Sequence, residues 1–426
     1  MVVVNALLKN ISLLNQNNTS KEVPVIHRVL LFTPSIRKHI DFQNMEMIIK
    51  QYMSNSSVLK SDLLRIIAKY NEVSVEVDAV KVESKDIVDY YLASILVYQL
   101  LSINKYEDCY QIIHQLIMHF QTVGYMDKQK EYIVCRLYTY LMILNNHHYP
   151  LPTLLPDLLS SYRIGCLHNN RIVCVRNMSE LSFQSGIYNC ILRVYIDAKQ
   201  YLTAAHFLQK TEYPSDVSDK QYVRYCFYKA LVSTVLLDYS EAEHSLFVIH
   251  KKYGNPNGVF AEEVGKLFIL VKLLIGEKPD LNQVPSTRPL RPYRDLAVVV
   301  MQGDLSAYKH VIEQKKQQFV EDGLMRIVSR LHNTVIRIAL VKMAKSYSRI
   351  SLAEIASILE LDNVEEARCT CMRNIRDGII QGCIEGDYFT AEDSSSAIMT
   401  NKPTDLFSKK IAVCLNLRKE IIKSSV

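Results

Sequence analysis

Apolar and polar residues follow one another along most of the chain with the period of an α-helix. Residues 219–237, 240–252 and 259–275 are examples, because their apolar positions recur every three or four residues and share one helix face. Glycine and proline are few, with 12 of each among 426 residues, which favours helices over strands and turns. The pattern predicts a mainly α protein.

A short signature recurs where one predicted helix follows another. Each copy has a tyrosine and, three positions later, a small residue: Tyr106 with Cys109, Tyr201 with Ala204, and Tyr239 with Ala242. In helical-repeat proteins an aromatic ring fills the turn between paired helices, and a small residue lets the helices approach closely. The copies are irregularly spaced, so we expect a degenerate TPR-like solenoid. Unrelated helix pairs in a globular bundle are the alternative.

The stretch SYSRISLAEIASILELD, residues 346–362, contains a helix start signal. Ser351 and Glu354 have the spacing of a capping box, in which each side chain bonds the backbone amide of the other residue. The apolar positions after it fall on one face: Leu352, Ile355, Ala356 and Leu359. A helix beginning at this serine is therefore predicted.

A second helix and a hairpin follow directly. Asn363 and Glu366 repeat the capping spacing, Gly378 suits the helix end, and Gly386-Asp387 suits a two-residue type II′ turn. We expect the buried face of this helix to consist of Val364, Ala367, Cys371 and Ile375. Two helices followed by a hairpin predict a winged helix, a fold that binds either DNA or other proteins.

The charge distribution favours proteins over nucleic acid. Residues 309–349 hold nine Lys/Arg and three Asp/Glu, whereas residues 351–389 hold three Arg and eight Asp/Glu. A DNA-reading winged helix needs cations on its second helix, and here arginines are balanced by acids. The basic stretch has an amphipathic pattern typical of a solvated helix face, although an RNA patch or a site for an acidic protein segment are alternatives.

The composition, 49% hydrophobic and 22% charged, is that of an ordinary soluble protein. The start, MVVVNALLKN, lacks the features of a secretory signal, and the longest uncharged stretch contains three prolines, so we expect an intracellular protein without membrane spans. The ten cysteines, such as Cys190 and Cys414, have apolar neighbours and no CxxC spacing. This predicts buried, reduced thiols.

No catalytic or metal-binding pattern is present. Lys266 follows glycines, but the spacing and the missing hydroxyl exclude a phosphate-binding loop. Cys369 and Cys371 would point about 200° apart on a helix, and His147-His148 lies in a proline-rich loop without further ligands. We therefore expect no metal and no cofactor, and we favour a protein that is not an enzyme. A site assembled from distant residues has no support in the sequence.

Two proline clusters, at residues 150–156 and 279–292, predict long connections or boundaries. With the winged helix and the apolar tail they divide the chain into five expected segments. These are a helical-repeat region at 1–285, a further helical part at 286–345, the winged helix at 346–392, a linker at 393–402 and a C-terminal helix at 403–426.

The segments RLHNTVIRIALVKMAKSYSRISLAEIASILELD and IRDGIIQGCIE resemble PCI-domain proteins, and within that family the non-ATPase regulatory subunits of the 26S proteasome lid. The resemblance is specific over residues 289–387 and weaker over 195–276. It implies a non-catalytic scaffold, built from a helical-repeat arm, a winged helix that stacks beside those of neighbouring PCI subunits, and a C-terminal helix in a shared bundle. It also implies a hetero-oligomer that supports ubiquitin-dependent degradation in cytoplasm and nucleus.

Three groups of residues are the expected contacts with partners. The hairpin leaves an unpaired strand edge, with Ile380, Ile384 and Tyr388 beside it. The tail helix is apolar enough to need a cover, through Phe407, Ile411, Cys414, Leu415, Ile421 and Ile422. Packing of this helix onto its own domain is the alternative. The basic stretch, through Lys315, Lys316 and Arg326, suits the small, acidic, disordered protein that the resemblance implies.

Related scaffolds remain alternatives to the proteasome lid. PCI subunits also occur in RNA-associated complexes of translation initiation or messenger-RNA export, and in the COP9 signalosome. The sequence alone ranks these below a lid subunit, because the segments quoted above resemble lid subunits most. Binding of nucleic acid or of a membrane is not expected.

Overall fold

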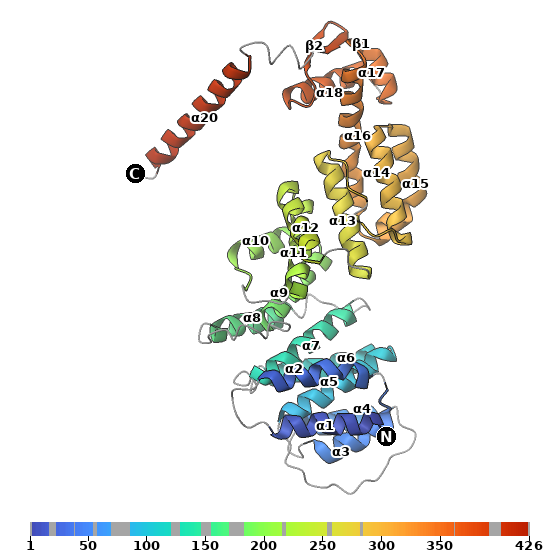
Figure 1. Ribbon diagram of the computed structural model, residues 1–426, viewed down its shortest axis with the longest axis vertical. Helices are drawn as coiled ribbons and strands as arrows, with labels where there is room; N and C mark the ends of the chain where they lie inside the picture. Colours follow the sequence, from blue (N-terminus) through green and yellow to red (C-terminus); the bar gives the residue numbers. More distant parts are fainter. Residues whose placement is uncertain are drawn as a thin grey trace. The chain divides into compact units, whose positions relative to one another are not determined.

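The computed structural model describes residues 2–16, 23–37, 39–53, 58–69, 86–120, 128–145, 155–169, 183–214, 219–253, 258–281, 284–361, 363–391 and 402–424. The chain folds as two compact units, Met1–Leu236 and Leu237–Val426. Both are mainly helical, as the hydrophobic pattern predicts (Figure 1). None of the described helices is both long enough and apolar enough to cross a membrane.

The described part of the first unit consists of helices (Figure 1). In chain order they are α1 (Val2–Gln16), α2 (Val23–Arg37), α3 (Phe42–Tyr52), α4 (Val58–Ala68), α5 (Asp86–Ser102), α6 (Tyr106–His119), α7 (Lys128–Asn145), α8 (Leu155–Asn169), α9 (Phe183–Asp197), α10 (Tyr201–Lys210) and α11 (Asp219–Val235).

Helix α5 forms the centre of this unit. It is apolar around most of its circumference and is buried by α1, α2, α3, α4, α6 and α7. Its Tyr91 hydroxyl lies 3.2 Å from Asn10 Nδ2 and 3.3 Å from Thr33 Oγ1, so one buried phenol connects three helices. Farther along, α9 has the same central position, packed by α7, α8, α10 and α11.

The tyrosine signature marks real helix starts. Helices α6 and α10, and α12 (Tyr239–Tyr253) of the second unit, each begin at the expected tyrosine. The small residues three positions later are completely buried: Cys109, Ala204 and Ala242. Two residues before each tyrosine the backbone has a positive φ, at Asn104, Lys199 and Leu237. These left-handed residues end one helix and let the chain turn into the next.

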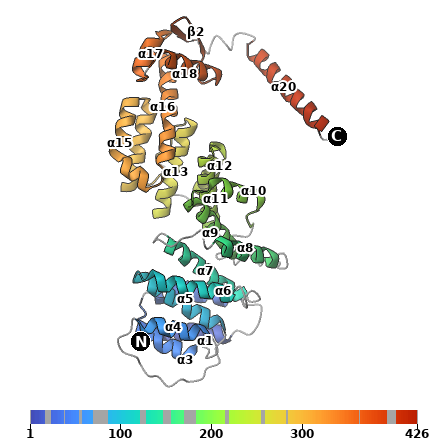
Figure 2. The ribbon, with the colours of Figure 1, turned by 180° about the vertical axis from the view of Figure 1, so that it is seen from behind.

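In the second unit α12 is followed by α13 (Val259–Ile275), the short 3₁₀ helix η4 (Arg288–Leu290), α14 (Arg291–Gln302), α15 (Leu305–Glu321) and α16 (Met325–Ser346). Helices α13 to α16 pack against one another, as both views show (Figures 1 and 2). The Asp304 side chain accepts hydrogen bonds from the amides of Ser306 and Ala307, and thereby caps α15.

The carboxyl end of α16 leads into the predicted winged helix. It consists of β1 (Arg349–Ser351), α17 (Leu352–Ile358), α18 (Val364–Arg376), β2 (Gly382–Glu385) and β3 (Tyr388–Ala391). The strands form an antiparallel sheet in the order β1-β3-β2. Residues 350, 389 and 384 lie side by side across it. The hairpin turn has Gly386 at φ +60° and no positive φ at Asp387, which is the type II′ combination expected.

Several local predictions for this module are confirmed. Ser351 Oγ accepts a hydrogen bond of 3.2 Å from the Glu354 amide. The expected face of α17 is buried, at Leu352, Ile355, Ala356 and Leu359. Helix α18 ends just before Gly378, whose φ of +74° is left-handed.

Other predictions for the module are wrong. The two-stranded hairpin is incomplete as a description of the sheet, because residues 349–351 pair with β3 as a third strand just before the predicted start of α17. Asn363 adopts the extended backbone of a cap but makes no side-chain capping bond. Val364 is 41% exposed, whereas Asn374 is buried on the inner face of α18 beside Ala367 and Cys371. Asn374 is accommodated there because its amide donates to the Thr370 carbonyl.

The chain continues with α20 (Lys402–Ser424), which contains the predicted tail helix. Residues 393–401 of the expected linker lie outside the described residues, as do Pro150 and Pro152, while Pro156 lies in the first turn of α8. The second proline cluster surrounds η4 and the start of α14.

Candidate protein-interaction surfaces

The sheet of the winged helix has one face toward the helices and one face outward. Neighbouring residues in the register share a face, so Ile350, Phe389 and Ile384 form one row. Ile350 and Phe389 are buried, which identifies this row as the inner one. The rows on either side, which contain Arg349 and Tyr388, therefore face outward.

Strand β2 is an edge strand. Within the described residues it pairs with β3 alone, so its other side offers backbone amides and carbonyls to a further strand. Ile384 lies on this edge and is half-buried, and Tyr388 is 44% exposed on the outer face. Ile380 does not belong to the surface, because its side chain is 4% exposed and packs inside the module.

The hairpin turn is fixed to the helices by two groups of Asp387. Its carbonyl accepts a hydrogen bond of 2.8 Å from the Leu352 amide at the start of α17. Its carboxylate lies 2.9 Å from the Arg368 guanidinium on α18. On the outer face the Arg349 guanidinium stacks 4.5 Å above the ring of Tyr388. The edge strand is thus presented on a turn that is held from two sides.

The three predicted basic residues lie on either side of the turn between α15 and α16. Lys315 is half-buried on α15, and Lys316 and Arg326 are exposed. None of the three side chains forms an ion pair or hydrogen bond in the part of the chain that the structure describes. Their charges are therefore available to a partner.

Other cations of the basic stretch bind within the chain, a pairing that the sequence alone does not predict. Lys309 Nζ lies 2.7 Å from a Glu360 carboxylate oxygen, and Arg337 lies 3.8 Å from Asp377. Both acids belong to the winged helix, so the basic and acidic stretches partly neutralise each other. Lys342 donates to the Gln302 carbonyl at 2.9 Å.

Helix α20 carries the largest set of exposed apolar side chains among the described helices. The side chains of residues 404–422 are exposed. They include the predicted Phe407, Ile411, Cys414, Leu415, Ile421 and Ile422. Three more residues that were not among the predicted ones are 52% to 59% exposed: Leu406, Val413 and Leu417. Their spacing of seven and then four residues, which places all three on one helix face, was the signal that identifies them.

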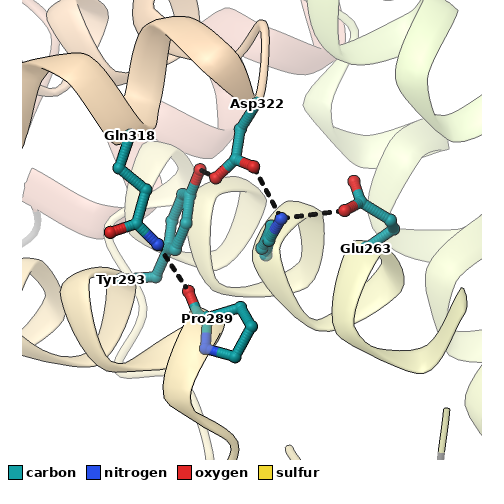
Figure 3. A network of polar contacts seen from close by, with 6 residues as sticks. Glu263, Pro289, Tyr293, Gln318 and Asp322 are labelled. Carbon is teal, nitrogen blue, oxygen red and sulfur yellow. Dashed lines mark hydrogen bonds and ion pairs between the residues drawn. The ribbon is translucent and has the colours of Figure 1, made fainter. Parts of the chain in front are cut away.

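A buried polar network connects helices of the second unit (Figure 3). The Lys266 ammonium on α13, 5% exposed, lies 2.8 Å from Glu263 and 2.8 Å from Asp322. Asp322 also accepts a hydrogen bond of 2.7 Å from the Tyr293 hydroxyl. Beside it, Gln318 donates to the Pro289 carbonyl at 3.3 Å. The lysine that resembled part of a phosphate-binding loop is therefore a structural cation.

The pKa directions agree with this assignment. Burial alone would lower the pKa of Lys266, but the hydrogen bonds and charges of Asp322 and Glu263 raise it above the usual 10.5. Burial, together with the hydrogen bond to Asp322, raises the pKa of Tyr293. The ammonium and the phenol therefore keep their protons at neutral pH. The position of this lysine inside the apolar run GKLFIL was the sequence signal that its ammonium is buried and needs an acidic partner.

The cysteines of the described segments fall into a buried and an exposed group. Cys109, Cys190, Cys226 and Cys371 are buried, as expected, whereas Cys369, Cys383 and Cys414 are exposed, which corrects that expectation for those three. Burial raises the pKa of the Cys371 thiol to about 11. No three His, Cys, Asp or Glu side chains within the described segments could hold a metal ion. His147 and His148 lie outside them.

Comparisons with known proteins agree with these observations. A family model described as "PSMD3-like, N-terminal TPR repeats" matches residues 1–297, and one described as "PCI domain" matches residues 297–385. The chain is 30% identical to the probable 26S proteasome regulatory subunit rpn3 of Schizosaccharomyces pombe, over 97% of this chain and 83% of that protein. It is 27% identical to 26S proteasome non-ATPase regulatory subunit 3 of Dictyostelium discoideum, over 98% and 84%. The predicted family resemblance is confirmed, and it extends to residue 1.

Proposed function

Because this chain belongs to the family of 26S proteasome non-ATPase regulatory subunit 3, with its TPR-like repeats and PCI domain, we propose that it is a non-catalytic scaffold of the proteasome lid. In this role it holds neighbouring subunits in position, so that other parts of the particle process ubiquitinated substrates. The protein then acts in cytoplasm and nucleus, and its partners are lid subunits with PCI domains of their own.

The exposed apolar residues of α20 are the observation that carries this proposal. Six large side chains between Leu406 and Leu417 are 49% to 66% exposed on one helix. Apolar surface of this extent is stable in water only when another surface covers it. Helices from neighbouring subunits fit this requirement, because an apolar helix face packs well against other helices. We therefore assign α20 to a helical bundle shared by lid subunits.

Removal of residues 403–426 tests the proposal. The shortened chain keeps all described residues up to 391, so we expect its far-ultraviolet circular dichroism to indicate a folded, mainly helical protein. Co-expressed with the other lid subunits, it should fail to enter the lid, as judged by native gels and mass spectrometry of the purified particle. Normal assembly of the shortened chain would contradict the proposal.

The edge of β2 supplies a second proposed contact. A strand from an adjacent winged helix that pairs with β2 would extend the sheet and use Ile384 and Tyr388 at its margin. The fixed turn at Asp387 supports this role, because a rigid edge loses little conformational entropy on pairing.

The basic surface formed by Lys315, Lys316 and Arg326 is our proposed site for a small, acidic, disordered protein. Reversal of all three charges to glutamate should abolish binding of an acidic peptide to the purified full chain, with little change in circular dichroism. Lys278→Glu, at an exposed position in another segment, is the control. Salt-dependent binding of single-stranded RNA that disappears in the triple variant would instead favour an RNA-associated scaffold.

A further inference from the structure

The apolar residues of α20 cover about half of the helix circumference. At 3.6 residues per turn, successive residues are about 100° apart. Leu406, Phe407, Ile411, Val413, Leu415 and Leu417 then fall within one arc of about 200°. A single neighbouring helix covers a stripe of roughly 100°. An arc this wide therefore requires two neighbouring helices.

Two cations lie inside this apolar arc. On the same helical projection Lys410 and Arg418 are each about 40° from the centre of the arc, one on either side. Both are exposed on α20, and neither side chain forms an ion pair or hydrogen bond among the described residues. Their sequence neighbours Lys409 and Lys419 lie about 40° from the centre of the opposite, polar face. The helix thus contains matched pairs of cations on its two faces.

Covering the arc changes the surroundings of Lys410 and Arg418 but not those of Lys409 and Lys419. A cation enclosed between apolar helices loses water, and this is costly unless a carboxylate compensates for it. The charges of α20 itself offer little compensation, since it contains six Lys/Arg and only two Asp/Glu, at Asp405 and Glu420.

We propose that α20 is received by two helices of neighbouring subunits, each of which places an Asp or Glu within its apolar face, opposite Lys410 or Arg418. This inference rests on the proposed bundle and specifies the chemistry of its partners. The apolar arc provides the affinity, and the two charge pairs fix the rotation and axial position of α20 between the two helices. A bundle without those carboxylates would reject this helix.

Methionine substitution distinguishes paired cations from cations that merely extend to water. Methionine keeps the length and helix propensity of lysine or arginine but removes the charge. If Lys410 and Arg418 are paired, Lys410→Met and Arg418→Met leave a partner carboxylate buried and alone, which weakens incorporation by about thirtyfold. If instead the side chains extend past the partners to water, methionine adds apolar contact, and incorporation stays equal or improves.

The measurement is a competition. Equal amounts of wild-type and variant full chain are mixed with the remaining lid subunits, and mass spectrometry gives the ratio of the two in assembled lids. Lys409→Met and Lys419→Met, on the polar face, should compete equally with wild type. Equal or better competition by Lys410→Met and Arg418→Met would overturn the inference.

Phe407→Asp separates failure of this inference from failure of the proposed function. The substitution places a charge in the apolar arc and should exclude the chain from the lid. If Phe407→Asp is excluded while both methionine variants compete fully, α20 is covered but its cations are not paired. If Phe407→Asp also competes fully, α20 is not covered at all, and the scaffold proposal itself loses its main support.

Discussion

At the scale of single residues, two glycines with the same backbone conformation differ only in the space around them. Gly303 and Gly323 have φ of +69° and +70°, and each follows a helix. A Cβ on Gly323 would meet nothing within 4 Å, whereas one on Gly303 would lie 3.0 Å from the backbone nitrogen of Ala339 on α16. Gly323 is thus required only for its backbone conformation. Gly303 is required both for its conformation and for the close approach of the chain to α16.

Replacement of each glycine by alanine should therefore lower the free energy of unfolding by different amounts. We expect Gly323→Ala to destabilise the second unit by about 1 kcal/mol through left-handed strain. Gly303→Ala should cost about 3 kcal/mol, because the backbone of α16 must also move. Thermal unfolding of the two full-length variants measures the difference, and similar melting temperatures would show that the contact with α16 yields easily.

The Lys266 network makes a prediction about both stability and pH. Lys266→Met leaves Asp322 without its ammonium partner. We therefore expect the free energy of unfolding of α13 and α15, measured by hydrogen exchange of their backbone amides, to fall by about 2 kcal/mol. The folded pKa of Lys266 is raised above 10.5, so its contribution is fully present below that pH and is lost only at higher pH. The destabilisation caused by Lys266→Met should hence be equal at pH 6 and pH 9. A smaller destabilisation at pH 9 than at pH 6 would contradict the assignment of Lys266 as a buried, charged partner of Asp322.

At the scale of elements, two helix starts with nearly the same sequence signal differ in their bonds. Ser351 bonds the Glu354 amide, but Asn363 makes no side-chain capping bond. Ser351→Ala should consequently destabilise the winged helix by about 1 kcal/mol, and Asn363→Ala by less than about 0.5 kcal/mol. Hydrogen exchange in α17 and α18 tests this. Equal effects would mean that Asn363 caps α18 in solution.

Much of the fold could be predicted because helix-forming signals are local. The hydrophobic period, the tyrosine turns, Gly378 and the Gly386-Asp387 turn each act within a few residues of themselves. Strand β1 could not be predicted in this way, since three residues form a strand only when a distant segment pairs with them. Likewise Ile380 reads as a surface residue of a hairpin until the helices that bury it are in place.

The candidate surfaces show the same division between local and distant information. The apolar face of α20 follows from sequence spacing alone, although Leu406, Val413 and Leu417 were needed to complete it. Sequence spacing does not show that the charges of Lys316 and Arg326 are available to a partner. Lys309 in the same stretch is paired with Glu360, 51 residues away. Which cations remain for a partner is decided by the tertiary structure.

At the scale of the whole molecule, the second proline cluster lies within the second compact unit. The compact units divide between Leu236 and Leu237, whereas the prolines mark residues 279–292. The physical reason is that α13 packs against α14 and α16, which come after the prolines. Lys266 on α13 also pairs with Asp322 at the end of α15. The proline segment is thus an internal connection of the second unit.

Two fragments test this boundary. Residues 237–426 keep α12, α13 and the Lys266 network, so we expect this fragment to unfold cooperatively. Residues 286–426 lose α13, which exposes the apolar sides of α14 and α16 and leaves Asp322 with only the Tyr293 hydroxyl. The shorter fragment should aggregate or show no cooperative transition by circular dichroism and calorimetry, because both a core layer and a buried cation are missing. Cooperative unfolding of residues 286–426 at a similar temperature would instead place the boundary at the prolines, and α13 would then belong to the helical-repeat region.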